Sequence, residues 1–166
     1  MRYLTDETDC NIHDNGTIKI TSNSILNVRR HPKNLVDCQS DNYSHSSNGR
    51  GPCICFDFKD RRVQLSDYSI KSFSSGQSGG LLRNWVLEVS SDGGSWEEVD
   101  CHTEDPTPDG PGITANYKLA NASSGFYRYI KLRSTGCSWY NYPSDNYFIY
   151  FYFIEFFGKL DESQCK

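Results

Sequence analysis

The fold class follows from one stretch of the sequence, which reads Trp85-Val86-Leu87-Glu88-Val89-Ser90-Ser91-Asp92-Gly93-Gly94-Ser95-Trp96-Glu97-Glu98-Val99. Apolar side chains alternate with other residues on both sides of a short polar segment that contains Asp-Gly. Alternation with a period of two is typical of a half-buried strand, and Asp-Gly between two such runs is a strong hairpin signal. The stretch therefore predicts two antiparallel strands joined by a tight turn, with Trp96 in the core.

Similar runs recur along the rest of the chain. Residues 17–21, 54–58 and 127–133 alternate in the same way, and residues 147–157 are aromatic on both faces, as in a central strand buried on two sides. No window keeps apolar residues at helical spacing for more than about two turns. Short strands joined by loops rich in Gly, Ser, Asn, Asp and Pro predict one all-β domain, a sandwich or a barrel.

Charge and hydropathy exclude some classes of function. The chain has 17 basic and 21 acidic residues, whereas nucleic-acid binding calls for a basic face. The most apolar stretch, residues 147–154, is far shorter than the ~20 residues of a transmembrane helix. The first residues turn acidic at once and lack the apolar core of a signal peptide. We therefore expect no nucleic-acid partner, no transmembrane segment and no export signal.

The cysteines bear on the compartment. Seven of them, at positions 10, 38, 53, 55, 101, 137 and 165, form no even framework, which favours free thiols in a reducing compartment. Glycosylation sequons at Asn15, Asn42 and Asn121 argue the other way, although such triplets also arise by chance in this composition. The expected localisation is cytoplasmic. A secreted or cell-surface location is the alternative if the chain is an excised domain.

Four motifs in register resemble a known family. They are Ile54-Cys55-Phe56-Asp57-Phe58, the hairpin with Ser90-Ser91-Asp92-Gly93 and Trp96, Tyr127-Arg128-Tyr129-Ile130-Lys131-Leu132, and Phe153-Ile154-Glu155-Phe156-Phe157-Gly158. Together they resemble the discoidin or coagulation factor 5/8 type C domain, a galactose-binding-domain-like fold, over about residues 11–160. Segments 1–10 and 161–166 then flank the domain. The resemblance implies an eight-stranded antiparallel jelly-roll sandwich whose loops at one end bind glycans, lipids or proteins.

Two positions depart from the secreted members of that family. Lys159 stands where they place a closing Cys after the final Gly, and Cys53 stands where they tend to have Trp. The first departure favours an intracellular version of the domain, such as those found in large protist families. Both departures put transfer of a lipid-binding function in doubt.

Catalytic signatures are missing from the sequence. There is no G-x-S-x-G elbow, no H-E-x-x-H and no phosphate-binding glycine loop. Cys101 and His102 are adjacent on a predicted strand, so their side chains face opposite ways. Cys53 and Cys55 share a strand face, as soft-metal ligands or as two small buried side chains, but no second pair completes a zinc site. We predict that the chain is not an enzyme.

The resemblance also implies a calcium site. Its ligands would be Asp37, Asn42 and Glu155, with carbonyl oxygens of the same loop, because Ca²⁺ takes six to eight oxygen ligands. Cys38 stands where the family has Gly, and Asn42 where it has Thr. An Asp-capped loop and a Glu paired with Lys or Arg explain the same residues without a metal. We expect weak calcium binding or none, and no other cofactor.

The predicted ligand surface lies on loops that the family places side by side. Segments 73–83 and 136–147 match those loops, with 42–50 as a third wall. Arginine forks and aromatic rings on polar loops are typical anchors of recognition surfaces, although the rings would equally pack over the open end of the sandwich. The candidate ligand-binding residues are Arg50, Leu81, Leu82, Arg83, Trp139 and Tyr142.

These observations predict a non-catalytic recognition module. The leading hypothesis is protein–protein interaction within a cytosolic adaptor, and the alternative is a carbohydrate-binding, lectin-like domain at a cell surface. The sequence does not decide between a protein partner and a glycan.

Overall fold

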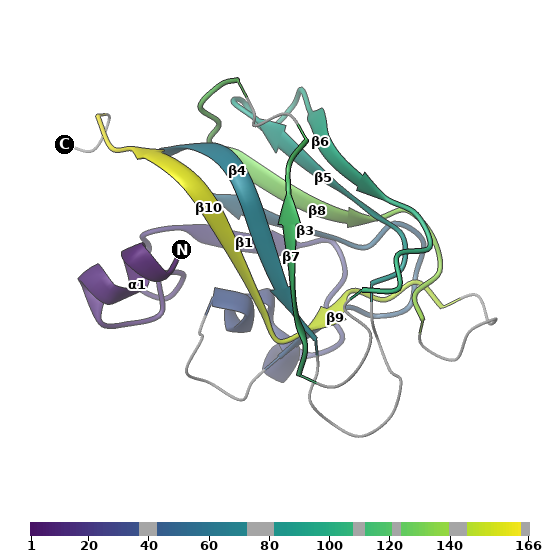
Figure 1. Cartoon of the computed structure of the whole chain (residues 1–166). Helices are drawn as coiled ribbons and strands as arrows, with labels where there is room; N and C mark the ends of the chain where they lie inside the picture. The colour runs from purple at the N-terminus through teal and green to yellow at the C-terminus, as the bar shows by residue number, and fades with distance from the viewer. Residues whose placement is uncertain (37–42, 73–81, 108–111, 121–123, 140–145, 164–166) are drawn as a thin grey trace.

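Two antiparallel sheets form a sandwich in the computed structural model, which describes residues 1–36, 43–72, 82–107, 112–120, 124–139 and 146–163 (Figure 1). The five-stranded sheet has the order β1-β3-β8-β5-β6 and the three-stranded sheet the order β10-β4-β7. These strands confirm the predicted eight-stranded jelly roll. Their bounds are β1 Lys19–Ser22, β3 Cys53–Asp57, β4 Arg62–Lys71, β5 Trp85–Ser90, β6 Glu97–His102, β7 Thr114–Lys118, β8 Tyr129–Ser134 and β10 Phe153–Asp161.

Shorter elements complete the structure. Strands β2 (Ser44–His45) and β9 (Tyr150–Phe151) pair with each other, and two 3-10 turns, η1 (Val28–Arg30) and η2 (Pro32–Val36), precede β2. Helix α1 (Arg2–Thr8) is two turns long and packs beside β10. Met1 and Leu4 are 8% and 3% exposed and belong to the common core. The segment before residue 11 is therefore packed onto the sandwich.

The predicted alternation is confirmed in the central strands. Ile54, Phe56 and Phe58 are at most 2% exposed, whereas Cys53 and Cys55 lie on the other face of β3. The ring of Phe56 meets Phe156 of β10 edge to face at 5.0 Å, which joins the two sheets. The core therefore lies between the sheets.

The decisive hairpin also forms as expected. β5 pairs with β6 in antiparallel register, from Trp85 opposite His102 to Val89 opposite Glu97. In the turn, Oδ1 of Asp92 accepts hydrogen bonds from the backbone N–H groups of Gly94 and Ser95, both at 2.8 Å. An Asx-type turn of this kind explains why the polar segment stops the first strand and starts the second.

Trp96 is an exception, because it does not lie in the core. The ring is half-buried, and Nζ of Lys131 lies 3.6 Å from its centroid. Ile130 and Leu132 of β8 are fully buried, so Lys131 lies on the outer face of the five-stranded sheet. The aromatic ring is covered there by a cation and its aliphatic stem.

The prediction of a central strand over residues 147–157 is also wrong. The segment divides into β9 and β10, and among the described strands β10 pairs only with β4, so it is an edge strand. The side chain of Phe157 is 46% exposed, and a bulge follows it at Gly158. Helix α1 packs beside this strand (Figure 1), and an edge covered in this way can be as apolar as a central strand.

One end of the sandwich is here called the loop end. It comprises the ends of β1, β4, β6 and β8, the starts of β3, β5, β7 and β10, and the described residues next to them. Trp85 pairs with both Ser134 and His102, and Lys71 pairs with both Thr114 and Phe153, so these strands stop at the same level. The two main predicted ligand loops, so far as they are described, therefore lie at one end.

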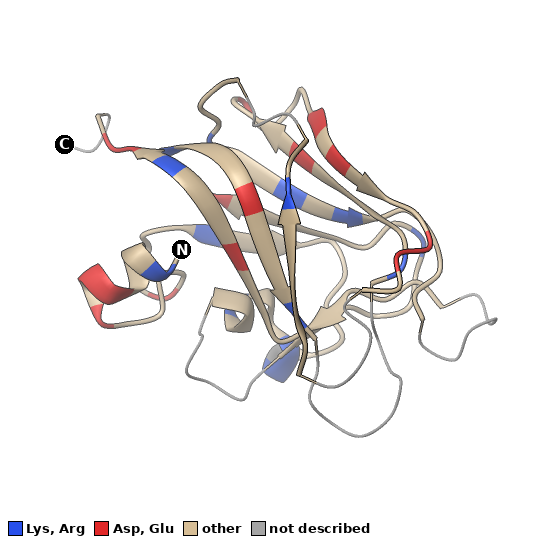
Figure 2. Cartoon of the chain, viewed as in Figure 1, with Lys and Arg blue, Asp and Glu red and all other residues tan. Residues whose placement is uncertain are grey.

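Charge is distributed unevenly over the chain. Acidic side chains gather on α1 and β6, whereas Lys and Arg are spread over several strands (Figure 2). No described helix is long and apolar enough to cross a membrane.

Candidate functional site at the loop end

Trp139 and Arg83 lie against each other at the loop end. The guanidinium carbon of Arg83 is 4.6 Å from the centroid of the Trp139 ring. Arg83 also forms an ion pair with Glu104, whose side chain is mostly exposed. The indole Nε1–H of Trp139 donates to the backbone oxygen of Asp105 at 2.8 Å. The half-buried indole is thus held at its N–H edge by Asp105 and on one ring face by Arg83.

His102 and two aspartates lie beneath this pair. Nε2 of His102 is 2.9 Å from Oδ2 of Asp100, and Nδ1 is 2.7 Å from Oδ2 of Asp105. The imidazole stacks on Trp85, with centroids 4.3 Å apart and planes at 13°. The hydroxyl of Tyr68 donates to Asp100 at 2.8 Å, so the network reaches the three-stranded sheet.

Sequence reasoning missed this network. Asp100 and His102 share a face of β6 because they are two residues apart, and Asp105 follows just after the strand. The spacing Asp-x-His-x-x-Asp at the end of a predicted strand was the available signal. Tyr68 comes from a different sheet, and no local pattern connects it to the others.

A second group of rings, here called the aromatic strip, also lies at the loop end. The imidazole of His45 stacks on Tyr150 at 4.7 Å and meets Phe148 edge-on at 5.1 Å. Tyr43 packs against Tyr150 at 4.9 Å, and the guanidinium carbon of Arg30 lies 3.5 Å from the Tyr43 centroid. Burial, followed by the charge of Arg30, lowers the pKa of His45. The imidazole is therefore neutral at pH 7.

Not all predicted ligand residues are accessible. Leu82 is 3% exposed and belongs to the core, so its assignment to a ligand surface is wrong. Arg83 is 8% exposed and holds internal partners. Arg50 is exposed and Trp139 half-buried, as a contact residue requires. Leu81 and Tyr142 lie outside the described residues.

The predicted calcium ligands are only partly described. Asp37 and Asn42 lie outside the described residues. Glu155 is 7% exposed, and its Oε1 contacts the amino group of Met1 and accepts the backbone N–H of Arg2 at 2.7 Å. Within the described part of the chain, no group of three or more His, Cys, Asp or Glu side chains is arranged to hold a metal ion.

The oxidation state of the cysteines stays a prediction. Cys10, Cys53, Cys55 and Cys101 form no disulfide. Burial, with the nearby Cys53, raises the pKa of the Cys55 thiol to about 11. Cys55 is therefore a neutral thiol at pH 7 and a poor nucleophile or metal ligand.

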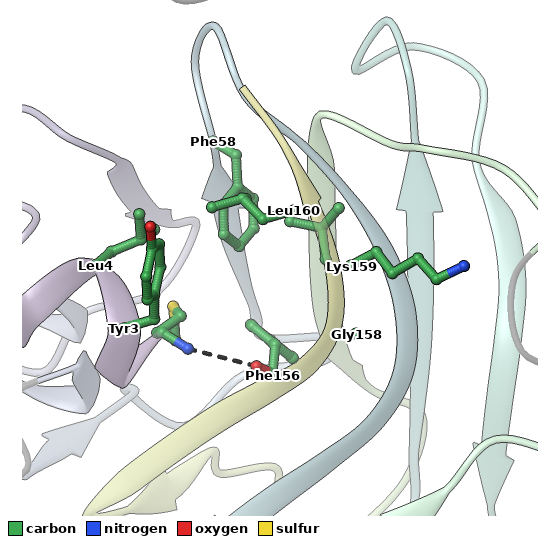
Figure 3. A pocket seen from close by; sticks show the side chains of 9 residues that line it. Tyr3, Leu4, Phe58, Phe156, Gly158, Lys159 and Leu160 are labelled. Atoms are coloured by element: carbon green, nitrogen blue, oxygen red, sulfur yellow. Dashed lines mark hydrogen bonds between the residues drawn. The ribbon is translucent and has the colours of Figure 1, made fainter. Parts of the chain in front are cut away.

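Two hollows lie away from the loop end. An apolar pocket of about 170 Å³ separates α1 from β10 and is lined by Leu4, Phe58, Phe156 and Leu160, among others (Figure 3). The amino group of Met1 donates to the Phe156 oxygen at 3.3 Å across its floor. A more open pocket of about 280 Å³ adjoins the β5–β6 turn beside Trp96.

Comparison with curated proteins gives partial sequence matches. The E3 ubiquitin-protein ligase hecd-1 of Caenorhabditis elegans is 28% identical over 120 residues, which are 72% of this chain and 4% of that protein. The E3 ubiquitin-protein ligase Ufd4 of Drosophila melanogaster is 37% identical over 57 residues, 33% of this chain and 2% of that protein. The chain thus spans a few per cent of these ligases. No family model matches it.

Comparison with solved structures identifies the fold. CpGH89CBM32-5 of Clostridium perfringens, in complex with GalNAc-β-1,3-galactose, has a TM-score of 0.63 at 16% identity, covering 86% of this chain and 96% of its own. The C-terminal domain of a chitobiase from Bacteroides fragilis has 0.64 at 18%, covering 87% and 95%. A fucolectin of striped bass (Morone saxatilis) has 0.61 at 14%, covering 86% and 47%. The chain therefore has the galactose-binding-like, discoidin-type jelly-roll fold that these three structures share.

Proposed function

We propose that this domain is a non-catalytic recognition module that binds a carbohydrate at its loop end. The observation that carries the proposal is the half-buried indole of Trp139, which is held in one orientation by Asp105 and Arg83. A ring fixed before binding loses little conformational entropy when a ligand stacks on it. Solved neighbours of the same fold include a module in complex with GalNAc-β-1,3-galactose and a fucolectin.

Polar groups beside the aromatic strip would recognise hydroxyl groups. The side-chain amides of Asn48 and Asn146 lie 3.2 Å apart, and Asn48 also accepts the backbone N–H of Tyr147. The side chain of Arg50 is exposed near them in sequence and can make forked hydrogen bonds. Apolar rings together with a few oriented polar groups are the usual composition of small-molecule sites.

The test is binding of GalNAc-β-1,3-galactose, of galactose and of fucose, measured by calorimetry. We expect millimolar or tighter binding of at least one of them, and a loss of tenfold or more in Trp139→Ala, because stacked aromatic anchors contribute about 2 kcal/mol or more. Trp96→Ala is the matched control, since Trp96 lies half-buried on the outer face, away from the loop end. Equal affinity in wild type and Trp139→Ala would contradict the proposal.

A protein partner is the second candidate. The partial similarity to hecd-1 and Ufd4 favours it, because both are E3 ubiquitin-protein ligases and a ligase must bind other proteins. Ile25 and Leu26 are 38% and 47% exposed, and the N–H of Leu26 bonds the backbone oxygen of His45, beside the aromatic strip. If the domain binds a protein partner, we propose that it does so in the cytoplasm. The test is to measure the affinity of a purified partner protein for the domain. The partner should bind the wild type, its binding should not be displaced by sugars, and its affinity should be lower for the Leu26→Asp variant.

No cofactor is proposed for either candidate. A calcium ion at Glu155 would replace the contacts that Oε1 makes with Met1 and Arg2. We therefore propose that millimolar Ca²⁺ has little effect on the domain.

A further inference from the structure

His102 has a carboxylate oxygen on each of its ring nitrogens. The two distances are 2.9 Å from Nε2 to Asp100 and 2.7 Å from Nδ1 to Asp105. An ionised carboxylate only accepts hydrogen bonds, and a neutral imidazole carries a single N–H. The neutral ring would therefore leave one nitrogen lone pair facing a carboxylate oxygen. Only the charged imidazolium satisfies both contacts.

The surrounding groups favour the same charged state. Trp85 stacks on the ring and Tyr117 of β7 meets it edge-on at 4.8 Å. Tyr68 of β4 donates its hydroxyl to Asp100 and accepts the indole N–H of Trp85 at 3.0 Å. A cation against aromatic faces and between two carboxylates is well stabilised.

Charged and titratable groups surround His102 from several elements. Asp100 lies on β6, and Glu104 and Asp105 follow that strand. The hydroxyls of Tyr68 on β4 and Tyr117 on β7 and the guanidinium of Arg83, just before β5, complete the set. Arg83 is paired with Glu104, and Tyr117 donates its hydroxyl to the backbone oxygen of Thr107. Asp100 and Asp105 are therefore the two charges in direct contact with the imidazole.

Asp105 links this network to Trp139. Its side chain contacts His102, while its backbone oxygen accepts the indole N–H of Trp139 and its N–H donates to the Arg83 oxygen at 3.0 Å. The preceding residue, Glu104, has a φ of 53°, a left-handed conformation that persists only when neighbouring contacts hold it. The contact with His102 is one of those that hold this turn and the acceptor of Trp139, together with the hydrogen bond from the backbone N–H of Glu104 to Oδ1 of Asn84 at 3.0 Å.

We propose that His102, through Asp105, is a positioning residue for Trp139, and that its charged form holds the indole in its ligand-competent orientation. The inference rests on the proposed function only for the ligand-contacting role of Trp139. The orientation of the indole is a property of the free domain, and it can be measured without any ligand.

The direction of the pH dependence follows from the environment of the imidazole. Burial disfavours its charged form, but the hydrogen bond and charge of Asp100, followed by those of Asp105, outweigh burial and raise the pKa of His102 above 6.5. A group with a raised folded-state pKa stabilises the fold below its unfolded pKa. That stabilisation is lost as the pH rises through the folded pKa. We therefore expect Trp139 to be held in place below the folded-state pKa of His102 and released above it.

The experiment is an NMR titration of the ¹⁵N-labelled domain from pH 5.5 to 9.5. The indole N–H signals of the three tryptophans are assigned with Trp139→Phe and Trp96→Phe, and the ring protons of His102 are followed in parallel. We expect the Trp139 indole signal to shift with the same midpoint as His102, above pH 6.5. Gln cannot titrate, so in the His102→Gln variant the pH-dependent shift of the Trp139 indole signal should disappear. The other indole signals should keep their dispersion, which would show that the variant is still folded.

His31→Gln is the matched control, because burial lowers the pKa of His31 and it lies before β2 on a different segment. It should leave the Trp139 transition unchanged. A His102 titration that leaves the Trp139 signal unaffected, or a Trp139 transition that survives in His102→Gln, overturns the inference.

A binding arm separates this inference from the proposed function. Affinity for GalNAc-β-1,3-galactose should fall at least tenfold between pH 6 and pH 9 in the wild type, and His102→Gln should show no such dependence. If the indole titrates with His102 but the disaccharide binds at neither pH, the positioning role stands and the carbohydrate proposal fails. If the disaccharide binds equally at both pH values, the positioning role fails and the carbohydrate proposal stands.

Discussion

Arg83 shows how a side chain that resembles a ligand anchor can be part of the scaffold. In the sequence it follows a stretch rich in Ser and Gly, as an exposed contact residue would. In the structure it is 8% exposed, covers the indole of Trp139 and pairs with Glu104. The aliphatic stem of a buried arginine contributes packing as well as charge. Arg83 therefore supports the surface that Trp139 presents.

The expected effect of Arg83→Ala is on stability first. Removing the packing and the ion pair should lower the free energy of unfolding by roughly 1–3 kcal/mol, measured by urea denaturation. Arg50→Ala is the matched control, and its exposed side chain should change stability by no more than about 0.5 kcal/mol. Identical midpoints for the two variants would show that Arg83 is a surface residue after all.

At the scale of elements, β10 owes its course to one glycine. The register with β4 shifts between Phe157 and Gly158, and Gly158 has a φ of 151°. A Cβ built there would lie 2.0 Å from the backbone oxygen of Gln64. The bulge turns Phe157 outward and lets the rest of the strand continue along β4, beside the apolar pocket under α1.

Gly158→Ala should therefore destabilise the domain strongly. Backbone strain and a clash with a fixed carbonyl predict a loss of about 2 kcal/mol or more in the free energy of unfolding. Gly49→Ala is the control, because a Cβ at Gly49 meets nothing within 4 Å and its φ is not in the positive region. A Gly158→Ala melting temperature equal to that of Gly49→Ala would argue against the bulge as placed.

At the scale of the whole molecule, thiol chemistry tests the compartment. Cys10 and Cys101 are exposed, and Cys53 and Cys55 share the outer face of β3 without forming a disulfide. Structural disulfides are rare in reducing compartments. The proposal of a cytoplasmic location therefore requires that all the cysteines stay reduced in the folded protein.

Titration with a thiol reagent under denaturing, non-reducing conditions should find seven free groups, the number of cysteines in the chain. Under native conditions Cys10 and Cys101 should react first and Cys55 slowly, because its pKa is raised to about 11 and the thiolate is the nucleophile. Recovery of only one to three groups after denaturation would instead indicate disulfides and an oxidising compartment.

The fold class and the main strands could be predicted from the sequence alone. Alternation put Ile54, Phe56 and Phe58 on one face, and Asp92 with Gly93 set the hairpin, because period and turn chemistry are local properties. The family resemblance placed segments 73–83 and 136–147 at one end, and the described residues of both segments lie at the loop end. The sequence made Trp139 a candidate contact residue because an aromatic ring in a polar loop breaks the periodicity around it, and that role stays a prediction.

Which polar residues meet depends on how the two sheets pack together. His102 joins Asp100, Asp105 and Tyr68 because two sheets bring β6 and β4 together, and their separation in sequence carries no sign of it. The same holds for β10. Its apolar pattern predicted a central strand, whereas in the structure it is an edge strand beside α1. Burial depends on what packs against a residue from elsewhere in the chain. For that reason the sequence predicted strands better than it predicted sites.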